Sequence, residues 1–461
     1  MRAKTKMEEH FKREWGMGDF LRFVTPSILS IITISLYMVV DGLFVSRYAG
    51  PLALAAMNIT MPLFSFCFGI GIMVAAGSSA IIGIELGEGN REGANRHFSL
   101  AFASLVVVAV TILVMLKGVG GERISRLLGA TDTLLPYCAV YLKAFGVGLA
   151  VVVLQIFFEF FIRLDGKPVW AFYITLAGGF TNILLDYLLI VRLDMGLHGA
   201  GVASAAGIGL SGAMGIFYFL KRSVSLTFTR PKLDVPFLRD TVLNGSSEMI
   251  SEIASGVKTL VFNLVIITYA GEKGVAALSI IMYLYFMLSS LYIGLSMGVA
   301  PVLSFNYGAR NVEKLKGLIG HSFRVIGVTS LVTFVLTWVW GGQVIRLFAE
   351  GQPVVTAVAE GGLKIVTFTF LINGLTIFSS AFFTAMNNGK ISALLTFLRT
   401  FVFTLGFVWF LPRVMGLPGV WMSVPAAELA TLVVCLWFAR AYGGVYLSPG
   451  CGRDLQGVTR A

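Results

Sequence analysis

The sequence predicts an all-α polytopic membrane protein with twelve transmembrane helices, arranged as two pseudo-symmetric six-helix lobes around a central cavity. Its composition indicates a membrane protein, because 57% of the 461 residues are hydrophobic and 13% are charged, whereas a soluble domain carries about a quarter charged residues. Apolar segments long enough to span a bilayer, about 20 residues, recur along nearly the whole chain. The two halves of the chain also repeat one another. A β-barrel would instead show short alternating segments, which we do not find.

Glycine, proline and charged residues divide the apolar sequence into twelve expected spans. They are 19–46, 52–82, 95–116, 133–161, 168–191, 198–220, 237–269, 276–302, 318–341, 355–385, 390–412 and 418–441. An even number of spans places both termini on one side of the membrane. The segments on that side hold clearly more lysine and arginine than the opposite set. The positive-inside rule therefore predicts cytoplasmic termini, in a multi-pass protein of the cell (inner) membrane.

The longest polar break is KRSVSLTFTRPKLDVPFLRD, at 221–240, and it divides the chain into two halves. The opening residues carry charges of both signs and lack the apolar core of a signal peptide. We therefore expect five parts along the chain. They are a cytoplasmic amino-terminal segment (1–17), an amino lobe of six spans (18–220), a cytoplasmic inter-lobe loop (221–236), a carboxyl lobe of six spans (237–442) and a cytoplasmic tail (443–461).

The internal repeat appears when the first half is shifted by 221 positions, and it needs no gap. The YAG of 48–50 then falls on the YAG of 269–271, and GEGNRE of 87–92 falls on GARNVE of 308–313. A repeat unit with an even number of spans keeps its orientation in the membrane, so the axis that relates the lobes lies along the membrane normal. Transporters commonly place their substrate path between such halves.

Composition also limits what the chain binds. Its formal charge of +11 is explained by basic cytoplasmic loops, and no basic patch with a suitable fold is apparent, so we expect no nucleic-acid partner. The four cysteines show no CxxC spacing, and the four histidines show no HxxxH pair. We therefore expect no metal centre and no other cofactor, apart from H⁺ or Na⁺ as a coupling ion.

Polar residues inside apolar spans are costly and often mark function in membrane proteins. Asp41 lies near the outer end of the first span, and Asn182 and Asp186 share one face of the fifth because they are four residues apart. Asp41 could instead lie shallow and pair with Arg47, although six residues is a poor helical spacing for that contact. The Asn182–Asp186 pair suits a proton or small cation, and it equally suits a structural hydrogen bond between helices.

A polar stripe follows one face of the seventh span, at Glu248, Ser251, Glu252, Ser255 and Thr259. Lys258 falls off this stripe. We expect Glu248 and Glu252, with Asn373 of the tenth span, to form a candidate second polar site. An amphipathic helix entering the membrane would also explain Glu248, and it explains the deeper Glu252 less well.

Five further side chains are candidates for the wall of the substrate cavity: Tyr37, Gln155, Glu159, Tyr283 and Tyr285. Structural ion pairs are the alternative for the charged groups in the spans. Glu159 and Arg163 are four residues apart on one helix, which favours a pair there. Arg399 and Glu428 could form a similar pair between neighbouring helices.

Several segments together resemble the MATE family (multidrug and toxic compound extrusion). The sequence VDGLFVSRYAG at 40–50, followed by PLALAAMNITMP, resembles the first-loop signature of that family. The other segments that resemble it are ELGEGNREGANRHF (85–98), RLDGKP (163–168), NILLDYLLI (182–190) and GLHGAGVASA (196–205). The resemblance covers essentially the whole chain, from about 18 to 442.

The resemblance implies an antiporter whose lobes alternate between inward-open and outward-open states. In the DinF-type branch, the coupling site lies in the amino lobe, and its positions match Asp41, Asn182, Asp186 and, for a hydroxyl on the sixth span, Ser204. The branch of the norfloxacin pump has a second site with a glutamate on the seventh span and an aspartate on the tenth. Glu248 or Glu252 fits the first position, but the tenth span offers Asn373 and no aspartate.

We therefore expect a secondary active antiporter, and not an enzyme, that exports organic cations or other lipophilic compounds in exchange for H⁺ or Na⁺. It should work as a monomer among membrane lipids. The alternative is a flippase of the same superfamily for a lipid or lipid-linked oligosaccharide, whose cavity should be strongly cationic to hold pyrophosphate. The charges inside the spans are mostly acidic. An enzyme would need a convergent site or a motif such as HExxH, and the repeat argues against a passive channel.

Overall fold

The structure is a computed structural model that describes residues 11–349 and 351–447. In this part of the chain, eleven helices are long and apolar enough to cross a membrane. One of them, α9 (Val235–Gly308), runs for 74 residues and bends at Gly271, where the backbone is not helical. Because α9 therefore supplies two spans, the eleven helices supply twelve. The fold class expected from the sequence is confirmed.

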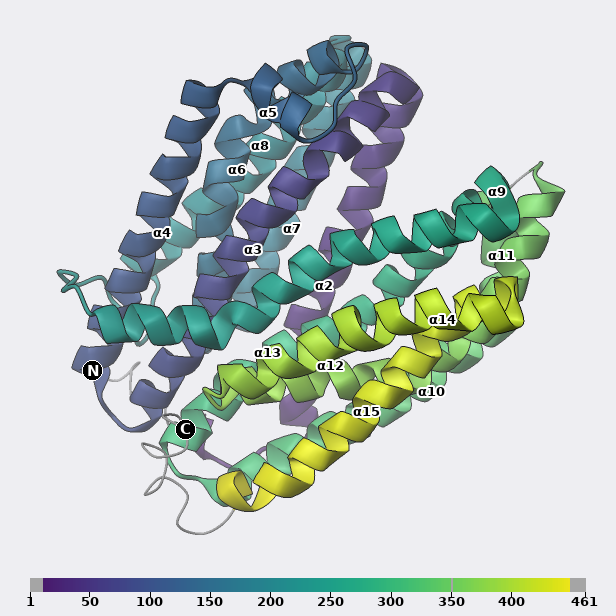
Figure 1. Cartoon of the computed structure of the whole chain (residues 1–461). Coiled ribbons are helices and arrows are strands. Elements are labelled where there is room, and N and C mark those ends of the chain that lie inside the picture. Colours follow the sequence, from purple (N-terminus) through teal and green to yellow (C-terminus); the bar gives the residue numbers. More distant parts are fainter. Residues whose placement is uncertain (1–10, 350, 448–461) are drawn as a thin grey trace.

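The amino lobe contains α2 (Met17–Phe44) with the π-helical η1 (Val45–Ala49), α3 (Pro51–Gly87), α4 (Arg91–Val119), the short α5 (Gly121–Leu127), α6 (Leu135–Leu164), α7 (Pro168–Asp186) with the π-helical η2 (Tyr187–Arg192), and α8 (Gly196–Lys221). The carboxyl lobe contains α9, α10 (Val312–Phe348), α11 (Pro353–Val366), η3 (Thr367–Thr369), α12 (Phe370–Ala385), α13 (Gly389–Phe397), the π-helical η4 (Leu398–Thr404), α14 (Leu405–Met415) and α15 (Leu417–Leu447). Figure 1 shows the lobes as two bundles whose helices run in different directions.

The internal repeat appears in the structure as matched breaks in the backbone. Gly50, with φ of 91°, follows the first span, and Gly271, with φ of 61°, ends the seventh span 221 positions later. Residues with a Cβ rarely adopt these angles, so both breaks favour glycine. Asn90 and Asn311 are also matched, since each caps the next helix by accepting the backbone N–H three residues further along.

The lobes contact one another closely where the ends of α3 and α9 meet. Gly87 lies against the carbonyl oxygen of Phe305, and Gly308 lies against that of Ile84. The shift of 221 positions turns one of these contacts into the other, as a twofold relation between the lobes requires. In Figure 1 the lobes approach one another near the two labelled termini and diverge on the opposite side. The space between them therefore widens away from the termini.

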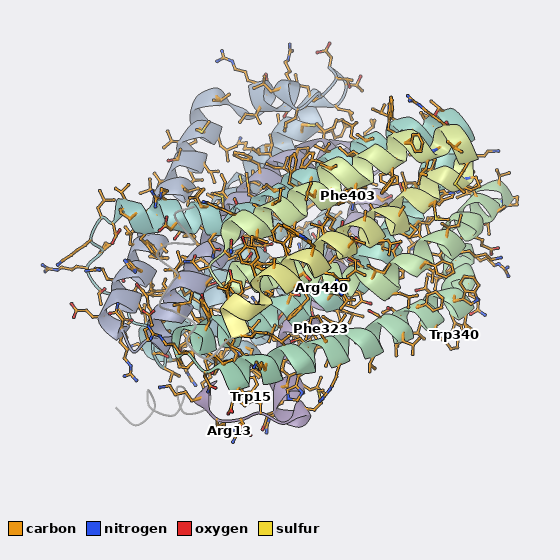
Figure 2. The ribbon with its side chains drawn as sticks, turned by 60° about the horizontal axis from the view of Figure 1, so that its bottom comes forward. Arg13, Trp15, Phe323, Trp340, Phe403 and Arg440 are labelled. Atoms are coloured by element: carbon orange, nitrogen blue, oxygen red, sulfur yellow. The ribbon has the colours of Figure 1, made fainter. Side chains whose placement is uncertain are left out.

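The segment before α2 packs against the carboxyl lobe. The amide of Asn306 donates to the carbonyl of Phe11 at 3.1 Å, and His321 Nε2 lies 3.0 Å from the carbonyl oxygen of Trp15. The ammonium of Lys314 lies 4.4 Å from the centre of the Trp15 ring. Figure 2 shows Trp15 at the same edge of the molecule as one end of α10. Of the two expected terminal segments, 1–10 and 448–461 lie outside the described residues.

The inter-lobe loop is held by a buried carboxylate at the end of α6. Asp165 accepts the backbone N–H groups of Val224, Ser225 and Leu226 at 2.7, 2.6 and 3.1 Å. It also accepts the hydroxyl of Tyr218 at 2.6 Å. These four bonds fix the path of the chain between α8 and α9.

Candidate functional site

A cavity of about 550 Å³ lies between the two lobes. One wall comes from α2, α3, α6, α7 and α8, and the other comes from α9, α12, α13, η4 and α15. Along α3 the lining runs from Met57 to Ala80 and stops before Gly87, where the lobes touch. The cavity is therefore closed toward the termini and continues toward the side on which the lobes diverge.

The four residues expected to bind the coupling ion converge on the amino-lobe wall. Asp41 comes from α2, Asn182 and Asp186 from α7, and Ser204 from α8. The carboxyl groups of Asp41 and Asp186 lie close enough to interact electrostatically, and no hydrogen bond joins them among the described residues. The amide of Asn182 donates to the hydroxyl of Ser204 at 3.3 Å. All but Asp186 line the cavity, and Asp186 is fully buried behind it. The alternative contact of Asp41 with Arg47 is not formed among the described residues.

This cluster has an excess of buried acceptor atoms. In the described chain, Oδ1 of Asp41, Oδ1 of Asn182 and both carboxylate oxygens of Asp186 accept no hydrogen bond. Buried polar atoms are nearly always satisfied, and leaving one unpaired costs about 1–3 kcal/mol. Two facing carboxylates repel one another when both are ionised. A shared proton, or a small cation among these oxygens, would remove both costs, because carboxylate and carbonyl oxygens suit hard cations.

The backbone next to this cluster is irregular in a way that favours function. The helix after Asp41 continues as the π-helical η1, and the helix after Asp186 continues as the π-helical η2. Such π-helical segments are rare and occur frequently at functional sites. Tyr141 of α6 also borders the cluster, since it lines the same cavity and its hydroxyl interacts with Asp41, Asp186 and Ser204. Sequence reasoning missed Tyr141 because a tyrosine in an apolar helix cannot be told from a packing residue.

The expected second polar site is only partly assembled. Glu248 and Glu252 both line the cavity from α9. Asn373 is fully buried and does not line it. Its amide donates to Ser289 at 2.7 Å, and its oxygen accepts from Arg399 at 2.8 Å. The structure thus places Asn373 in a different cluster from the two glutamates.

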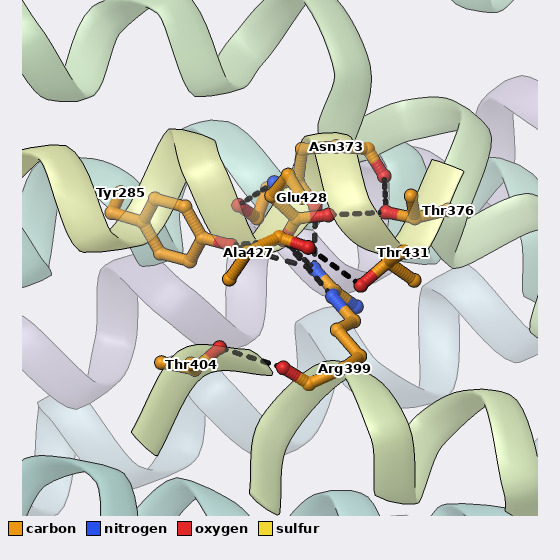
Figure 3. Close-up of polar contacts among 9 residues, drawn as sticks. Tyr285, Asn373, Thr376, Arg399, Thr404, Ala427, Glu428 and Thr431 are labelled. Carbon is orange, nitrogen blue, oxygen red and sulfur yellow. Dashed lines mark hydrogen bonds and ion pairs between the residues drawn. The ribbon is translucent and has the colours of Figure 1, made fainter. Parts of the chain in front are cut away.

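That other cluster is centred on an ion pair of the carboxyl lobe (Figure 3). Arg399 of η4 donates twice to Oε1 of Glu428 in α15, from Nε at 2.9 Å and from Nη2 at 2.5 Å. The hydroxyl of Thr376 donates to the other oxygen of Glu428 at 2.6 Å. The hydroxyl of Tyr285 lies 3.4 Å from Oε1. The expected pairing of Arg399 with Glu428 is confirmed, and it leaves the carboxylate fully partnered.

The expected wall residues are placed on the cavity with one exception. Tyr37, Gln155, Glu159 and Tyr285 line it. The prediction for Tyr283 is wrong, because this side chain is 63% exposed on the outside of α9 and does not line the cavity. Side chains two positions apart on an α-helix point in directions about 200° apart. Tyr283 and Tyr285 therefore cannot both face the cavity.

Glu159 also has the structural role that the sequence allowed. It pairs with Arg163 at 3.3 Å and accepts hydrogen bonds from Gln155 and Thr175, both at 3.1 Å. On α9, Lys258 lines the cavity although it was expected to lie off the polar stripe, whereas Thr259 does not line it. Lys258 follows Ser251 by seven residues, which is almost two full turns, and this spacing could have revealed its direction.

Comparison with known proteins gives a consistent result. The family model MatE matches residues 26–188 and 249–410, one segment in each lobe. The multidrug export protein MepA of Staphylococcus saprophyticus is 24% identical over 424 residues, which are 91% of this chain and 92% of that protein. MepA of Staphylococcus aureus is 25% identical over 431 residues, which are 93% of this chain and 94% of that protein.

Solved structures show the same fold. A MATE protein in complex with MaL6 has a TM-score of 0.89 at 22% identity, covering 95% of this chain and 98% of that one. A multidrug resistance MATE family transporter of the MOP superfamily, in an outward-facing conformation, has a TM-score of 0.86 at 23% identity. The match covers 92% of this chain and 94% of that one. A MOP superfamily transporter from Pyrococcus furiosus has a TM-score of 0.89 at 22% identity. The match covers 96% of this chain and 99% of that one.

Proposed function

Since the chain belongs to the MatE family, we propose that it is a secondary active antiporter that exports organic cations or other lipophilic compounds in exchange for H⁺ or Na⁺, by alternating access. Transport by a multi-pass membrane protein, and not catalysis, follows from the family itself. The observation that carries the proposal is that one cavity holds a buried acidic cluster in the amino lobe together with two glutamates on α9 that form no ion pair with any described residue. The substrate and the coupling ion thus have separate places on one path.

The substrate class is inferred from the walls of the cavity. Aromatic and aliphatic side chains form most of the lining, which suits a lipophilic compound. Glu248 and Glu252 add negative charge on the carboxyl-lobe wall, and the rings of Tyr37, Phe64 and Tyr285 can hold a cation through their π faces. The relatives that match along nearly the whole chain are named multidrug export proteins.

The coupling ion is inferred to bind at Asp41, Asn182, Asp186 and Ser204. The unpaired oxygens of these residues favour uptake of a proton or a sodium ion, and three of the four residues also line the substrate cavity. Ion binding can therefore be linked to substrate release, since a ligand shifts a conformational equilibrium by its differential affinity for the two states. The paired state of Arg399 and Glu428 disfavours a second coupling ion in the carboxyl lobe.

We place the protein in the cell (inner) membrane with both termini in the cytoplasm, on the strength of the basic residues in the loops on that side. In that orientation the structure corresponds to an outward-open state, because the lobes diverge on the side away from the termini. A monomer suffices for the proposed cycle, since one chain supplies all walls of the cavity.

The test is transport of a fluorescent organic cation, such as ethidium, in proteoliposomes with proton and sodium gradients imposed separately. We expect dye to move against its own gradient when one of the two ions flows the other way. A Glu248→Gln/Glu252→Gln double variant should carry the cationic dye more slowly, by about tenfold if one charge-assisted contact is lost. Dye that only equilibrates under both gradients would show that the protein is not an antiporter for organic cations.

A further inference from the structure

The charged side chains on the cavity wall differ in whether they have partners. Glu159 is held by Arg163, and Glu428 is held by Arg399. In the described part of the chain, Glu248, Glu252 and Lys258 form no hydrogen bond and no ion pair, and all three belong to the first half of α9. The unpaired charges on the carboxyl-lobe wall therefore have both signs.

Lys258 lies beside the Arg399 cluster. Its ammonium is 5.3 Å from the centre of the Tyr285 ring, and Arg399 and Glu428 are the charged groups that act on it. This part of the wall thus has two cationic side chains near the single carboxylate of Glu428, and only Arg399 is paired with it. The Nη1 nitrogen of Arg399 takes no part in the bonds to Glu428, Asn373 and Tyr285. This part of the wall has one positive charge in excess, although most of the cavity is acidic.

We propose that Lys258 and Arg399 form an anion subsite that binds the carboxylate of an amphoteric substrate while Glu252 or Glu248 binds its cationic group. The proposal deepens the proposed function and rests on it, because it assumes that this cavity is the substrate path. A cation in a largely apolar cavity is costly without a partner. A carboxylate between an ammonium and a guanidinium gains charge-assisted hydrogen bonds from both.

The helix geometry sets the distance between the two charged groups of such a substrate. Glu252 and Lys258 are six residues apart, which corresponds to about 9 Å along a helix, and Glu248 is about 15 Å away. The aromatic ring of Tyr285 lies next to the ammonium. The subsite therefore fits aromatic zwitterions whose charges are separated by a rigid ring system.

The test uses two dyes that differ in one group. Rhodamine B carries a cationic xanthene and a free carboxylate, whereas its ethyl ester has the same xanthene without the negative charge. Binding of each dye to detergent-purified protein is measured by fluorescence anisotropy in the absence of any gradient. We expect the wild type to bind rhodamine B at least as tightly as the ester.

Removing the ammonium should affect one dye. In Lys258→Met we expect rhodamine B to bind about tenfold more weakly, the loss of one charge-assisted contact, while binding of the ester changes less than twofold. Lys258→Arg keeps the charge and should keep the preference, and Lys258→Gln should behave like Lys258→Met. Ester binding and the thermal unfolding temperature confirm that each variant is folded.

Three outcomes separate the inferences. If Lys258→Met weakens binding of both dyes equally, or of neither, the subsite is overturned. The proposed function then remains intact if the wild type binds the ester and Glu252→Gln weakens binding of the ester. A wild type that binds neither dye would overturn both. Selective loss of rhodamine B in Lys258→Met and Lys258→Gln would establish the subsite.

Discussion

Gly87 of α3 lies directly against the carbonyl oxygen of Phe305 in α9, so that a methyl group on Gly87 would overlap that oxygen. Gly308 and Ile84 make the equivalent contact, so both glycines contribute to the closed side of the cavity. We expect Gly87→Ala and Gly308→Ala each to weaken this closure by about 1–3 kcal/mol, the usual cost of overpacking. The population of states open toward the termini should rise accordingly.

The measurement is labelling of a cysteine placed at Ser304, which lines the cavity close to this contact, in a protein without its natural cysteines. An impermeant maleimide added on the side of the termini should react roughly tenfold faster in either glycine variant. Gly320→Ala in α10 is the matched control, since no atom lies within 4 Å of the position its Cβ would take. Equal labelling rates in all four proteins would contradict this account of closure.

The ion pair of Arg399 and Glu428 should be costly to break from one side. Glu428 is 5% exposed and Arg399 is 25% exposed in their side chains, so removing one partner leaves a largely buried charge. We expect Arg399→Met to lower the free energy of unfolding by about 3 kcal/mol, and Arg399→Met/Glu428→Leu to lower it much less. Thermal unfolding in detergent measures both.

An exposed pair gives the control for this comparison. Arg346 and Glu360 also form an ion pair, at 2.8 Å, with 69% of the arginine side chain exposed. Arg346→Met should cost less than about 1 kcal/mol, as surface pairs usually do. If the double variant at Arg399 and Glu428 is no more stable than the single one, the charge left behind is not the source of the cost.

The inter-lobe loop should loosen when Asp165 is replaced. Asp165→Ala leaves three backbone N–H groups without their acceptor, each worth about 1 kcal/mol or more. Trypsin should then cut faster after Lys232 in the loop, and the free energy of unfolding should fall by about 3 kcal/mol. Asp240→Ala should change neither, because among the described residues this carboxylate forms an ion pair only with the exposed Arg239. Unaltered cleavage in Asp165→Ala would show that the loop is held by other contacts.

Asp234, at the start of α9, should contribute a pH-dependent part of the stability. Its side chain accepts the N–H of Phe237 at 3.0 Å, and this bond, together with His97, holds the pKa of Asp234 below its usual value. The contribution is therefore present above the usual pKa of aspartate, about 4, and is lost as the pH falls through the lower value of the folded state. The difference in unfolding temperature between wild type and Asp234→Asn should shrink between pH 6 and pH 3. A difference that stays constant over this range would contradict the assignment.

Much of the fold could be predicted from the sequence, because the membrane allows few solutions. Length, hydropathy and the repeat gave twelve spans, and the matched breaks at Gly50 and Gly271 appear in the structure where the repeat places them. The amino-lobe cluster was also found from sequence, since Asp41, Asn182 and Asp186 are polar residues that lipid alone cannot accommodate.

The rest of the site depends on helix rotation, which apolar sequence specifies poorly. Tyr283 and Tyr285 look alike in sequence, but only Tyr285 faces the cavity. Asn373 stands on the tenth span where the resemblance calls for an aspartate, and in the structure it bonds to Arg399 and Ser289 instead of joining the glutamates. The sequence predicts that Lys258 lies off the polar stripe, because it is six residues from Glu252. The cavity is wide enough that Lys258 and Glu252 both line it.

If the acidic cluster of the amino lobe couples transport to an ion gradient, replacing Asp41 by Asn should separate dye movement from that gradient. The measurement is dye movement in proteoliposomes, with the driving ion gradient and without it, for wild type, Asp41→Asn and the control Asp194→Asn, whose side chain is exposed after η2. We expect Asp41→Asn still to exchange dye across the membrane but no longer to move it against its gradient, while the control behaves as wild type. Full gradient-driven transport by Asp41→Asn would show that the coupling does not depend on this carboxylate.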